Sequence, residues 1–211
     1  MDFPSKEILE YCNRVTSPVS ETLESLARET HLTRLMPQML SGQHQGTFLR
    51  AMVAMLSAKV VVEVGTYTGY AAICMADGLA PGGMVHTIEI NPEQAEIINR
   101  YTKAAGHQNS IKLHIGDALE ILPRIDGPID FAFLDAKKED YGVYFDLLRD
   151  KIRPGGAILA DNVLWSGKTL QPEGDPAAEA LAAYNEKVTG DPEFFSVLIP
   201  MRDGLMLSVK K

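Results

Sequence analysis

Short apolar runs alternate with helical segments along most of the chain after Ala58. The runs are VVVEVG (60–65), MVHTIEI (84–90), IKLHIG (111–116), IDFAFLD (129–135) and AILADNV (157–163). Runs of this length and composition are typical of strands that are buried on both faces of a sheet. The helical segments lie near 70–79, 92–105, 117–124 and 141–152. This alternation predicts a parallel sheet with helices on both sides.

The two ends of the chain depart from this alternation. The tail reads FFSVLIP, MRDG and then LMLSVKK, which predicts an antiparallel hairpin. The first 60 residues favour three helices: one capped by Ser5, a second that starts at Ser17 ahead of Pro18, and a third near 45–58. We therefore predict an α/β protein with a doubly wound, Rossmann-like sheet. The sheet is expected to be mostly parallel, with a C-terminal antiparallel hairpin and a helical N-terminal segment.

The composition is typical of one globular domain. Of the 211 residues, 45% are hydrophobic and 23% are charged, so the chain can bury a sizeable core. We expect a single domain over 1–211, in which 1–58 form a helical cover and 59–211 form the core. The two cysteines, Cys12 and Cys74, are too few for a disulfide scaffold or a cysteine-based zinc site.

The charge and the apolar pattern limit the kinds of partner. A net charge of −8 argues against a broad surface for duplex DNA. No apolar run reaches the ~18 residues that a membrane span needs, and the N-terminus lacks the apolar region of a secretory signal. We therefore expect a cytoplasmic protein that acts on a small molecule and does not bind a membrane.

A glycine-containing turn follows the first apolar run, which ends in EVGTYTGY. Such a turn lets a ligand approach the backbone N–H groups at a helix N-terminus. Glu89 ends the second run, 24 residues beyond Gly65, where an acid can accept hydrogen bonds from ribose hydroxyls. A dinucleotide motif would need glycine in place of Tyr67 and Tyr70, and a P-loop lysine is missing. The turn therefore favours a nucleoside without phosphates, such as S-adenosylmethionine; the alternative is that Gly65 and Gly69 only make a tight turn.

Oxygen-bearing side chains follow the fourth and fifth apolar runs. Asp135 ends the fourth run, and Asp161 and Asn162 end the fifth. The carboxyl ends of neighbouring parallel strands lie about 4.8 Å apart, so these side chains can converge on one ion. Two carboxylates and an amide favour Mg²⁺ or a similar divalent cation, although each residue alone is also a common strand end. Lys138 lies three residues after Asp135, and in a helical turn it would face the same side as a candidate base.

These residues resemble the cation-dependent O-methyltransferases, the family of the catechol and caffeoyl-CoA O-methyltransferases and their small bacterial relatives. The resemblance covers about residues 39–209 and rests on motifs that stand in the family's order and spacing. The motifs are EVGTYTGYAA, HTIEINPE, GDALEILP, FAFLDAKKEDY, RPGGAILADNVLWSG and PMRDGLMLSV. No single motif is specific, whereas the set is. The resemblance implies a class I methyltransferase fold and S-adenosylmethionine as cofactor.

The resemblance also implies roles for individual residues. Asp135, Asp161 and Asn162 match the positions that hold the metal, and Lys138 matches the family's proposed general base. Glu89 would bind the ribose hydroxyls of the cofactor. The positions that would bind the cofactor are Met39, Ser41, Glu63, Gly65, Thr66, Tyr67, Ala71, Glu89, Asp117, Ala118 and Asp135.

The chain departs from the family's pattern in places. Ala71 stands where the family often has a serine, so a hydroxyl expected near the methionine carboxylate is missing. Mammalian catechol enzymes have His-Trp after the metal aspartate, and this chain has Ala136 and Lys137 there, which is more similar to the bacterial and plant branch. Trp165 is expected either to flank an aromatic acceptor or to pack at the base of its loop. The Pro/Gly-rich stretch 171–180 lies where relatives vary.

The activity implied is the transfer of a methyl group from S-adenosylmethionine, with a divalent cation, to a hydroxyl of a small catechol-like or hydroxycinnamoyl-type acceptor. An alternative within the family is methylation of a hydroxyuridine in tRNA. The charge of −8 argues against it, whereas basic residues near the predicted site, such as Lys168 and Arg202, leave it open. A third reading is a binding module without activity, which the metal and base residues disfavour. The resemblance further implies a homodimer.

Overall fold

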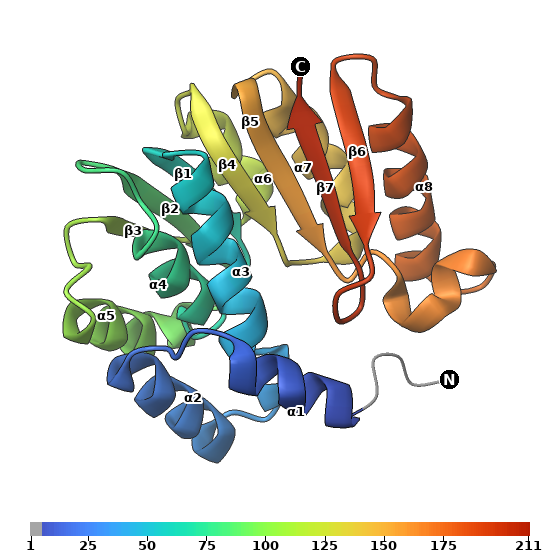
Figure 1. Ribbon diagram of the computed structural model, residues 1–211. Helices are drawn as coiled ribbons and strands as arrows, with labels where there is room; N and C mark the ends of the chain where they lie inside the picture. Colours follow the sequence, from blue (N-terminus) through green and yellow to red (C-terminus); the bar gives the residue numbers. More distant parts are fainter. Residues whose placement is uncertain (1–5) are drawn as a thin grey trace.

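The computed structural model describes residues 6–211, which form a seven-stranded sheet with helices on both faces (Figure 1). The strands are β1 (Val60–Val64), β2 (Met84–Glu89), β3 (Ile111–Ile115), β4 (Ile129–Leu134), β5 (Ile152–Asp161), β6 (Phe194–Ile199) and β7 (Leu205–Lys210). Their order is β3-β2-β1-β4-β5-β7-β6. Pairs from β3 to β5 are parallel, and β7 runs antiparallel to both β5 and β6. The predicted doubly wound sheet with a reversed strand near its edge is confirmed.

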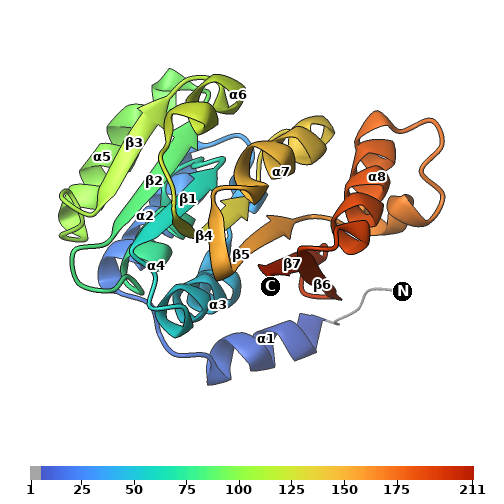
Figure 2. The same ribbon diagram turned by 90° about the horizontal axis from the view of Figure 1, so that it is seen from above.

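The helices divide between the two faces of the sheet. On one face lie α3 (Gly42–Met55), α4 (Tyr70–Ala76) and α5 (Ala95–Ala104), and on the other lie α6 (Ala118–Ile121), α7 (Tyr141–Arg149) and α8 (Pro176–Gly190) (Figures 1 and 2). Two further helices, α1 (Lys6–Val15) and α2 (Glu21–Thr33), lie beside the first group. No helix within residues 6–211 is long and apolar enough to cross a membrane.

Successive strand residues feed two separate cores. Val61 and Phe131 belong to the core under α3 to α5, whereas Val62 and Ala132 belong to the core under α6 to α8. Each of these side chains is fully buried, because side chains alternate between the faces and both faces are covered. This explains why the strands read as continuous apolar runs instead of an alternating pattern.

The second helix begins later than the sequence predicts. The start expected at Ser17 is wrong: α2 begins at Glu21, and Ser20 is its N-cap, with a side chain that accepts a hydrogen bond from the Leu23 backbone N–H. Pro18 disfavours helical backbone in the residue before it, so Ser17 is a poor first residue. The cap predicted at Ser5 lies outside the described residues.

Other helix boundaries also shift. The helix predicted over 45–58 spans Gly42–Met55, and Ser57 beyond its end has a left-handed φ of 48°. The helix predicted over 70–79 ends at Ala76. The segments predicted over 92–105 and 117–124 each contain a 3₁₀ turn next to a shorter α-helix. Asn91 caps the first of these segments, because its side chain accepts the Glu93 N–H.

The boundary between α7 and β5 is the largest correction. The helix predicted over 141–152 ends at Arg149, and the strand predicted over 157–163 spans Ile152–Asp161. The Pro-Gly-Gly segment (154–156) has a composition typical of a loop. In the structure it lies inside β5, as an irregularity between two positions that pair with β4. A bulge of this kind tolerates proline and glycine because it interrupts the ladder of hydrogen bonds.

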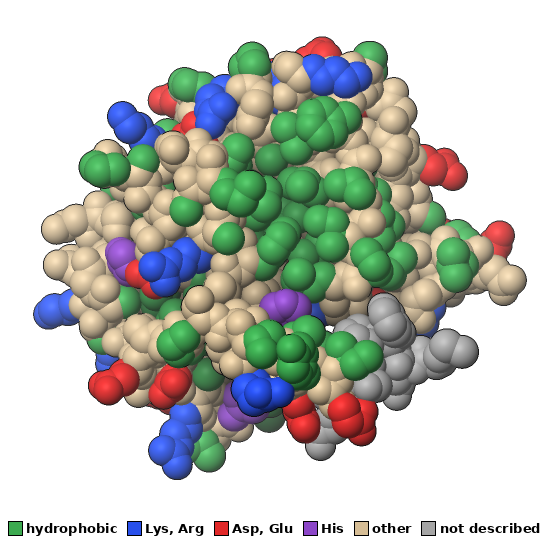
Figure 3. Space-filling view, in the orientation of Figure 1, with side chains coloured by type: hydrophobic (Ala, Val, Ile, Leu, Met, Phe, Trp, Pro, Cys, Tyr) green, Lys and Arg blue, Asp and Glu red, His purple; other side chains and the backbone are tan. Residues whose placement is uncertain are grey.

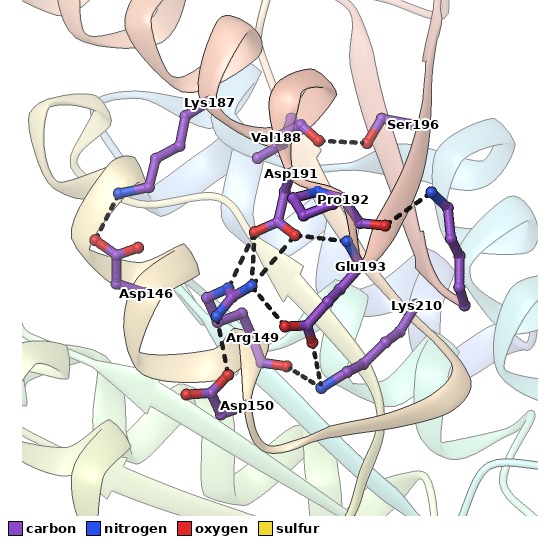
Figure 4. Close-up of polar contacts among 11 residues, drawn as sticks. Asp146, Arg149, Asp150, Lys187, Val188, Asp191, Pro192, Glu193, Ser196 and Lys210 are labelled. Atoms are coloured by element: carbon purple, nitrogen blue, oxygen red, sulfur yellow. Dashed lines mark hydrogen bonds and ion pairs between the residues drawn. The ribbon is translucent and has the colours of Figure 1, made fainter.

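A polar network joins α7 to the C-terminal hairpin (Figure 4). The Arg149 guanidinium contacts Asp191 at 2.9 Å and Glu193 at 3.2 Å. Lys210 Nζ donates to the Arg149 carbonyl oxygen at 2.8 Å. These residues lie at the end of α7, just before β6 and at the end of β7. This is the edge of the sheet opposite to the carboxyl end of β5.

Candidate active site

A cavity of about 500 Å³ opens at the carboxyl ends of the parallel strands β1 to β4. Its size is typical of small-molecule sites, and this edge of an open α/β sheet is where such sites form. Ten of the residues predicted to bind the cofactor line it: Met39, Ser41, Gly65, Thr66, Tyr67, Ala71, Glu89, Asp117, Ala118 and Asp135. Glu63 is the remaining one, and it does not line the cavity. The structure therefore brings the predicted positions together, while cofactor binding itself stays a prediction.

The glycines of the β1–α4 turn are required by backbone packing. Gly65 has φ +99°, and a Cβ atom there would collide with the carbonyl oxygen of Asp135. Gly69 has φ +93° and precedes α4, a conformation that favours glycine. The sequence left open whether Gly65 and Gly69 serve a bound nucleoside or only make a tight turn. The backbone conformation of the turn already requires both glycines, and Gly65 also allows the ends of β1 and β4 to meet.

Glu89 has a fixed orientation at the edge of the cavity. One carboxylate oxygen accepts the Tyr67 N–H at 2.7 Å, and the other accepts the Asn91 N–H at 2.9 Å. A carboxylate has about four lone-pair positions, so both oxygens can accept further hydrogen bonds from a ligand. The side chain is only 7% exposed and lines the cavity. It therefore presents a pair of oriented acceptors, as the ribose prediction requires.

Glu63 is a fully buried acid at the end of β1. Its Oε2 accepts a hydrogen bond from the Thr87 hydroxyl, while Oε1 has no partner. Burial raises the pKa of Glu63 to about 8; the Thr87 hydrogen bond opposes this shift, and the charges of Asp135 and Glu89 add to it. The sequence indicated the residue but not its burial away from the cavity surface.

The raised pKa of Glu63 predicts a pH-dependent stability. Between its ordinary pKa of 4.5 and about 8, the folded state holds a proton that the unfolded chain has lost. The free energy of unfolding therefore falls as the pH rises from 4.5 to about 8, by up to about 1.4 kcal/mol per pH unit. Below pH 4.5 Glu63 is protonated in both states and adds no pH dependence. Glu63→Gln is expected to flatten this slope, measured by urea unfolding at pH 5, 6.5 and 8. The exposed Glu186→Gln is the control; equal slopes in wild type and Glu63→Gln would refute the assignment.

The three predicted metal ligands lie at the ends of adjacent strands. Leu134 and Ala160 are register partners in the β4–β5 pair, so Asp135 and Asp161 follow paired positions. Asp161 is 1% exposed, and its Oδ1 accepts the backbone N–H of Asn162 at 2.7 Å. Asp135 lines the cavity, whereas Asp161 and Asn162 lie beyond its lining.

The two carboxylates repel each other. The pKa of Asp161 is raised to about 6, mainly by burial and then by the charge of Asp135, while the Gln45 hydrogen bond and the charge of Arg202 oppose the shift. The Asn162 side chain makes no hydrogen bond within residues 6–211, so its amide oxygen is free to act as a ligand. Within that range no group of three His, Cys, Asp or Glu side chains could hold a metal. The predicted set is not such a group, because it consists of two carboxylates and one amide. These oxygen donors fit a hard divalent cation, which would also offset the repulsion.

Lys138 is bonded directly to the end of β4 and, through the Tyr141 hydroxyl, to the end of β5. Its Nζ donates to Asp135 Oδ1 at 3.0 Å and to the Tyr141 hydroxyl at 2.7 Å. That hydroxyl lies 3.1 Å from the carbonyl oxygens of both Leu134 and Asp161. A 3₁₀ turn, Lys138–Asp140, produces this geometry, so Lys138 and Asp135 do face the same side. Lys138 is 8% exposed and does not itself line the cavity.

Sequence reasoning missed two side chains near the predicted metal ligands. Gln45 is fully buried, and its Nε2 donates to Asp161 Oδ2 at 2.7 Å. Arg202, which was noted only as a nearby basic residue, donates to Gln45 Oε1. A signal existed for Gln45, because it shares the buried face of α3 with Leu49 and Val53, four and eight residues on. Trp165 packs against the core under α7 and α8, as in the packing alternative.

Comparison with known proteins identifies a family that shares this architecture. The model of a family described as O-methyltransferase matches residues 13–211. A catechol O-methyltransferase of Niastella koreensis is 31% identical, over 83% of this chain and 84% of its own. A caffeoyl-CoA O-methyltransferase of Mesembryanthemum crystallinum is also 31% identical, over 80% of this chain and 72% of its own.

A solved structure has the same fold. The O-methyltransferase from Bacillus cereus, solved in complex with SAH, superposes with a TM-score of 0.91. It is 28% identical in sequence, and the match covers 97% of each chain.

Proposed function

Because this chain belongs to the S-adenosylmethionine-dependent O-methyltransferase family of the catechol and caffeoyl-CoA enzymes, we propose that it methylates a small catechol-like or hydroxycinnamoyl-type hydroxyl with the help of a divalent cation. The observation that carries this proposal is the juxtaposition at the ends of β4 and β5. Asp135 lines the cavity and lies beside Asp161, so the expected metal position adjoins the expected cofactor position. Mg²⁺ is the cation that this oxygen-donor set favours.

The residues around the cavity fit S-adenosylmethionine. Glu89 lines the cavity, and its two oriented oxygens suit two ribose hydroxyls. When bound, the cofactor supplies a methyl group on a positively charged sulfur. Ala71 offers no hydroxyl, but Thr68 also lines the cavity and brings one, which supports a substitute contact for the methionine carboxylate.

Asp135, Asp161 and Asn162 would hold the cation. A bound divalent ion lowers the pKa of a coordinated hydroxyl and holds its oxygen in place. Lys138, whose Nζ is 3.0 Å from Asp135 Oδ1, would remove the hydroxyl proton, and its hydrogen bond to Tyr141 supports this orientation of the amine. We call residues 36–45 the cover segment, since Met39, Leu40 and Ser41 line the cavity from outside the sheet. Excluding water from the cavity favours the reaction, because water stabilises the cationic sulfur and the anionic acceptor oxygen, and both become neutral as the methyl group is transferred.

A radiolabel assay tests the proposal. The purified protein is incubated with methyl-labelled S-adenosylmethionine, Mg²⁺ and a panel of catechols and hydroxycinnamoyl esters. We expect label transfer to a vicinal diol and its loss in a strong chelator, restored by added Mg²⁺. Transfer that survives the chelator refutes metal dependence. Transfer to tRNA alone, with salt-sensitive binding, replaces the small phenol with the RNA acceptor.

We also propose a homodimer formed through the solvent-exposed face of the hairpin of β6 and β7. Hydrophobic side chains gather over β5, β7 and β6 on the face in Figure 3. Phe195 and Val197 of β6 are 57% and 51% exposed there, beside Leu207 and Val209 of β7. A continuous apolar sheet face of this kind is typical of a protein interface. In a two-fold dimer, β6 and β7 of each copy would cover β6 and β7 of the other.

Val197→Lys is expected to convert the dimer to a monomer, because it places a charge in the middle of the proposed interface. Light scattering coupled to gel filtration measures the mass. The matched control is Val143→Lys, since Val143 is 48% exposed on α7, behind the sheet. A wild-type monomer, or a dimer that tolerates Val197→Lys and not Val143→Lys, contradicts this interface.

A further inference from the structure

Arg202 has an unusual backbone and an unusual set of partners. It lies in the β6–β7 turn with a left-handed φ of 50°, a conformation that side chains other than glycine adopt at a cost. Its guanidinium forms no ion pair within residues 6–211. Instead, Nη1 donates to the Ser41 carbonyl oxygen at 2.9 Å, and Nη2 donates to the Gln38 carbonyl oxygen at 3.4 Å. All of its partners therefore belong to the cover segment.

Gln45 connects Arg202 to Asp161. Its Oε1 accepts from Arg202 Nη1, and its Nε2 donates to Asp161 Oδ2 at 2.7 Å. The amide is fully buried, and both of its ends are engaged, so its orientation is determined: only the oxygen can face the guanidinium. The Asn162 N–H donates to Asp161 Oδ1, so each oxygen of the Asp161 carboxylate accepts one hydrogen bond.

The same turn also holds the loop that follows Asn162. Asp203 Oδ1 accepts the Ser166 N–H at 2.6 Å, and the Asp203 carbonyl oxygen accepts the Leu164 N–H at 2.9 Å. Gly204 has no space for a Cβ atom, because Leu164 lies against it. The turn thus joins the cover segment on one side to the chain after the metal position on the other.

We propose that Arg202 and Gln45 are positioning residues that orient the Asp161 carboxylate for the divalent cation and hold the cover segment closed over the cofactor cavity. The part that concerns the cation rests on the proposed function; the clamp on the cover segment does not. Neither side chain lines the cavity, so both act through the groups they bond. Partners of metal ligands typically change metal affinity by about 10–100-fold when they are removed.

The experiment compares Arg202→Ala, Arg202→Lys and Gln45→Leu with wild type. Mn²⁺ affinity is measured by electron paramagnetic resonance, SAH affinity by calorimetry, and hydrogen exchange of residues 36–45 in metal-free protein. We expect Arg202→Ala to weaken Mn²⁺ binding by about 10–100-fold and to speed exchange in the cover segment. Arg202→Lys should recover part of both effects, because lysine keeps the charge but lacks the forked donor.

Arg149→Ala is the matched control. It also removes an arginine that bridges chain segments, but at the opposite edge of the sheet (Figure 4). Its thermal midpoint is expected to fall while Mn²⁺ affinity and exchange of residues 36–45 stay at wild-type values. Gln45→Leu is expected to lose Mn²⁺ affinity as Arg202→Ala does, even where its thermal midpoint is preserved.

Two results would overturn the inference. Wild-type Mn²⁺ affinity in both Arg202→Ala and Gln45→Leu removes the role at Asp161, and unchanged exchange in Arg202→Ala removes the clamp. A wild-type protein that binds SAH but no Mn²⁺ contradicts the metal-dependent function and the role at Asp161 together. The exchange measurement still decides the clamp in that case, because it is made on metal-free protein.

Discussion

Asp161→Asn is expected to lower kcat by about 100-fold or more and to weaken divalent-cation binding in parallel. The residue lies at the end of β5 beside Asp135, so the change removes one of two negative charges from the donor set. It also places an amide against Gln45 Nε2, whose other end is bonded to Arg202 and cannot turn over. Loss of Lewis-acid assistance is worth several kcal/mol, and each 1.4 kcal/mol is tenfold in rate.

Initial rates at saturating Mg²⁺ and Mn²⁺ titrations measure this effect. The matched control is Asp146→Asn, because Asp146 is a surface residue of α7 that pairs with Lys187 (Figure 4). The control should retain both the rate and the Mn²⁺ affinity of the wild type. Full activity of Asp161→Asn, or an activity loss with unchanged Mn²⁺ affinity, would remove this residue from the metal site.

Lys138→Ala is expected to lower kcat by about 10²–10⁴-fold, the usual contribution of a general base. The amine is bonded to Asp135 and to the Tyr141 hydroxyl, so its position is set from two sides. SAH affinity should change little, because Lys138 does not line the cavity. Steady-state kinetics together with calorimetry separate these two quantities.

Lys138→Arg distinguishes a base from an ion-pair partner. Arginine keeps the positive charge beside Asp135 but does not give up its proton near neutral pH. A base role predicts that both variants are slow and that their kcat rises with pH as the acceptor ionises by itself. Activity retained in Lys138→Arg and lost in Lys138→Ala would show that only the charge matters. Lys187→Ala, which alters an exposed lysine of α8, is the control and should match the wild type.

The strand positions could be predicted because burial on both faces leaves a direct trace in the sequence. Val61 and Val62 enter different cores, and both are apolar, so the run needs no alternating pattern to be recognised. Boundaries were harder where one residue type serves two roles. The Pro-Gly-Gly segment reads as a loop in isolation, but inside β5 it is a bulge, because the register with β4 on both sides keeps the strand intact.

Part of the candidate site could also be predicted. Asp135, Asp161 and Asn162 stand directly after apolar runs, and strand order alone brings the ends of β4 and β5 together. Glu63 shows where this reasoning stops. Its position in the motif suggests a residue at the surface of the cavity, whereas its complete burial and its raised pKa depend on packing by neighbouring strands.

The amino-acid order by itself determined the alternating elements, the strand-end carboxylates and the glycine turn, because each depends on neighbours within a few residues. Only the tertiary structure decided that Arg202 bonds Gln45, since 157 positions separate them and no local pattern relates the two. It likewise decided that Gln45 bonds Asp161 across 116 positions. A hydrogen bond between distant segments needs both groups within bonding distance, and the packing of α3 against the sheet is what brings these groups together.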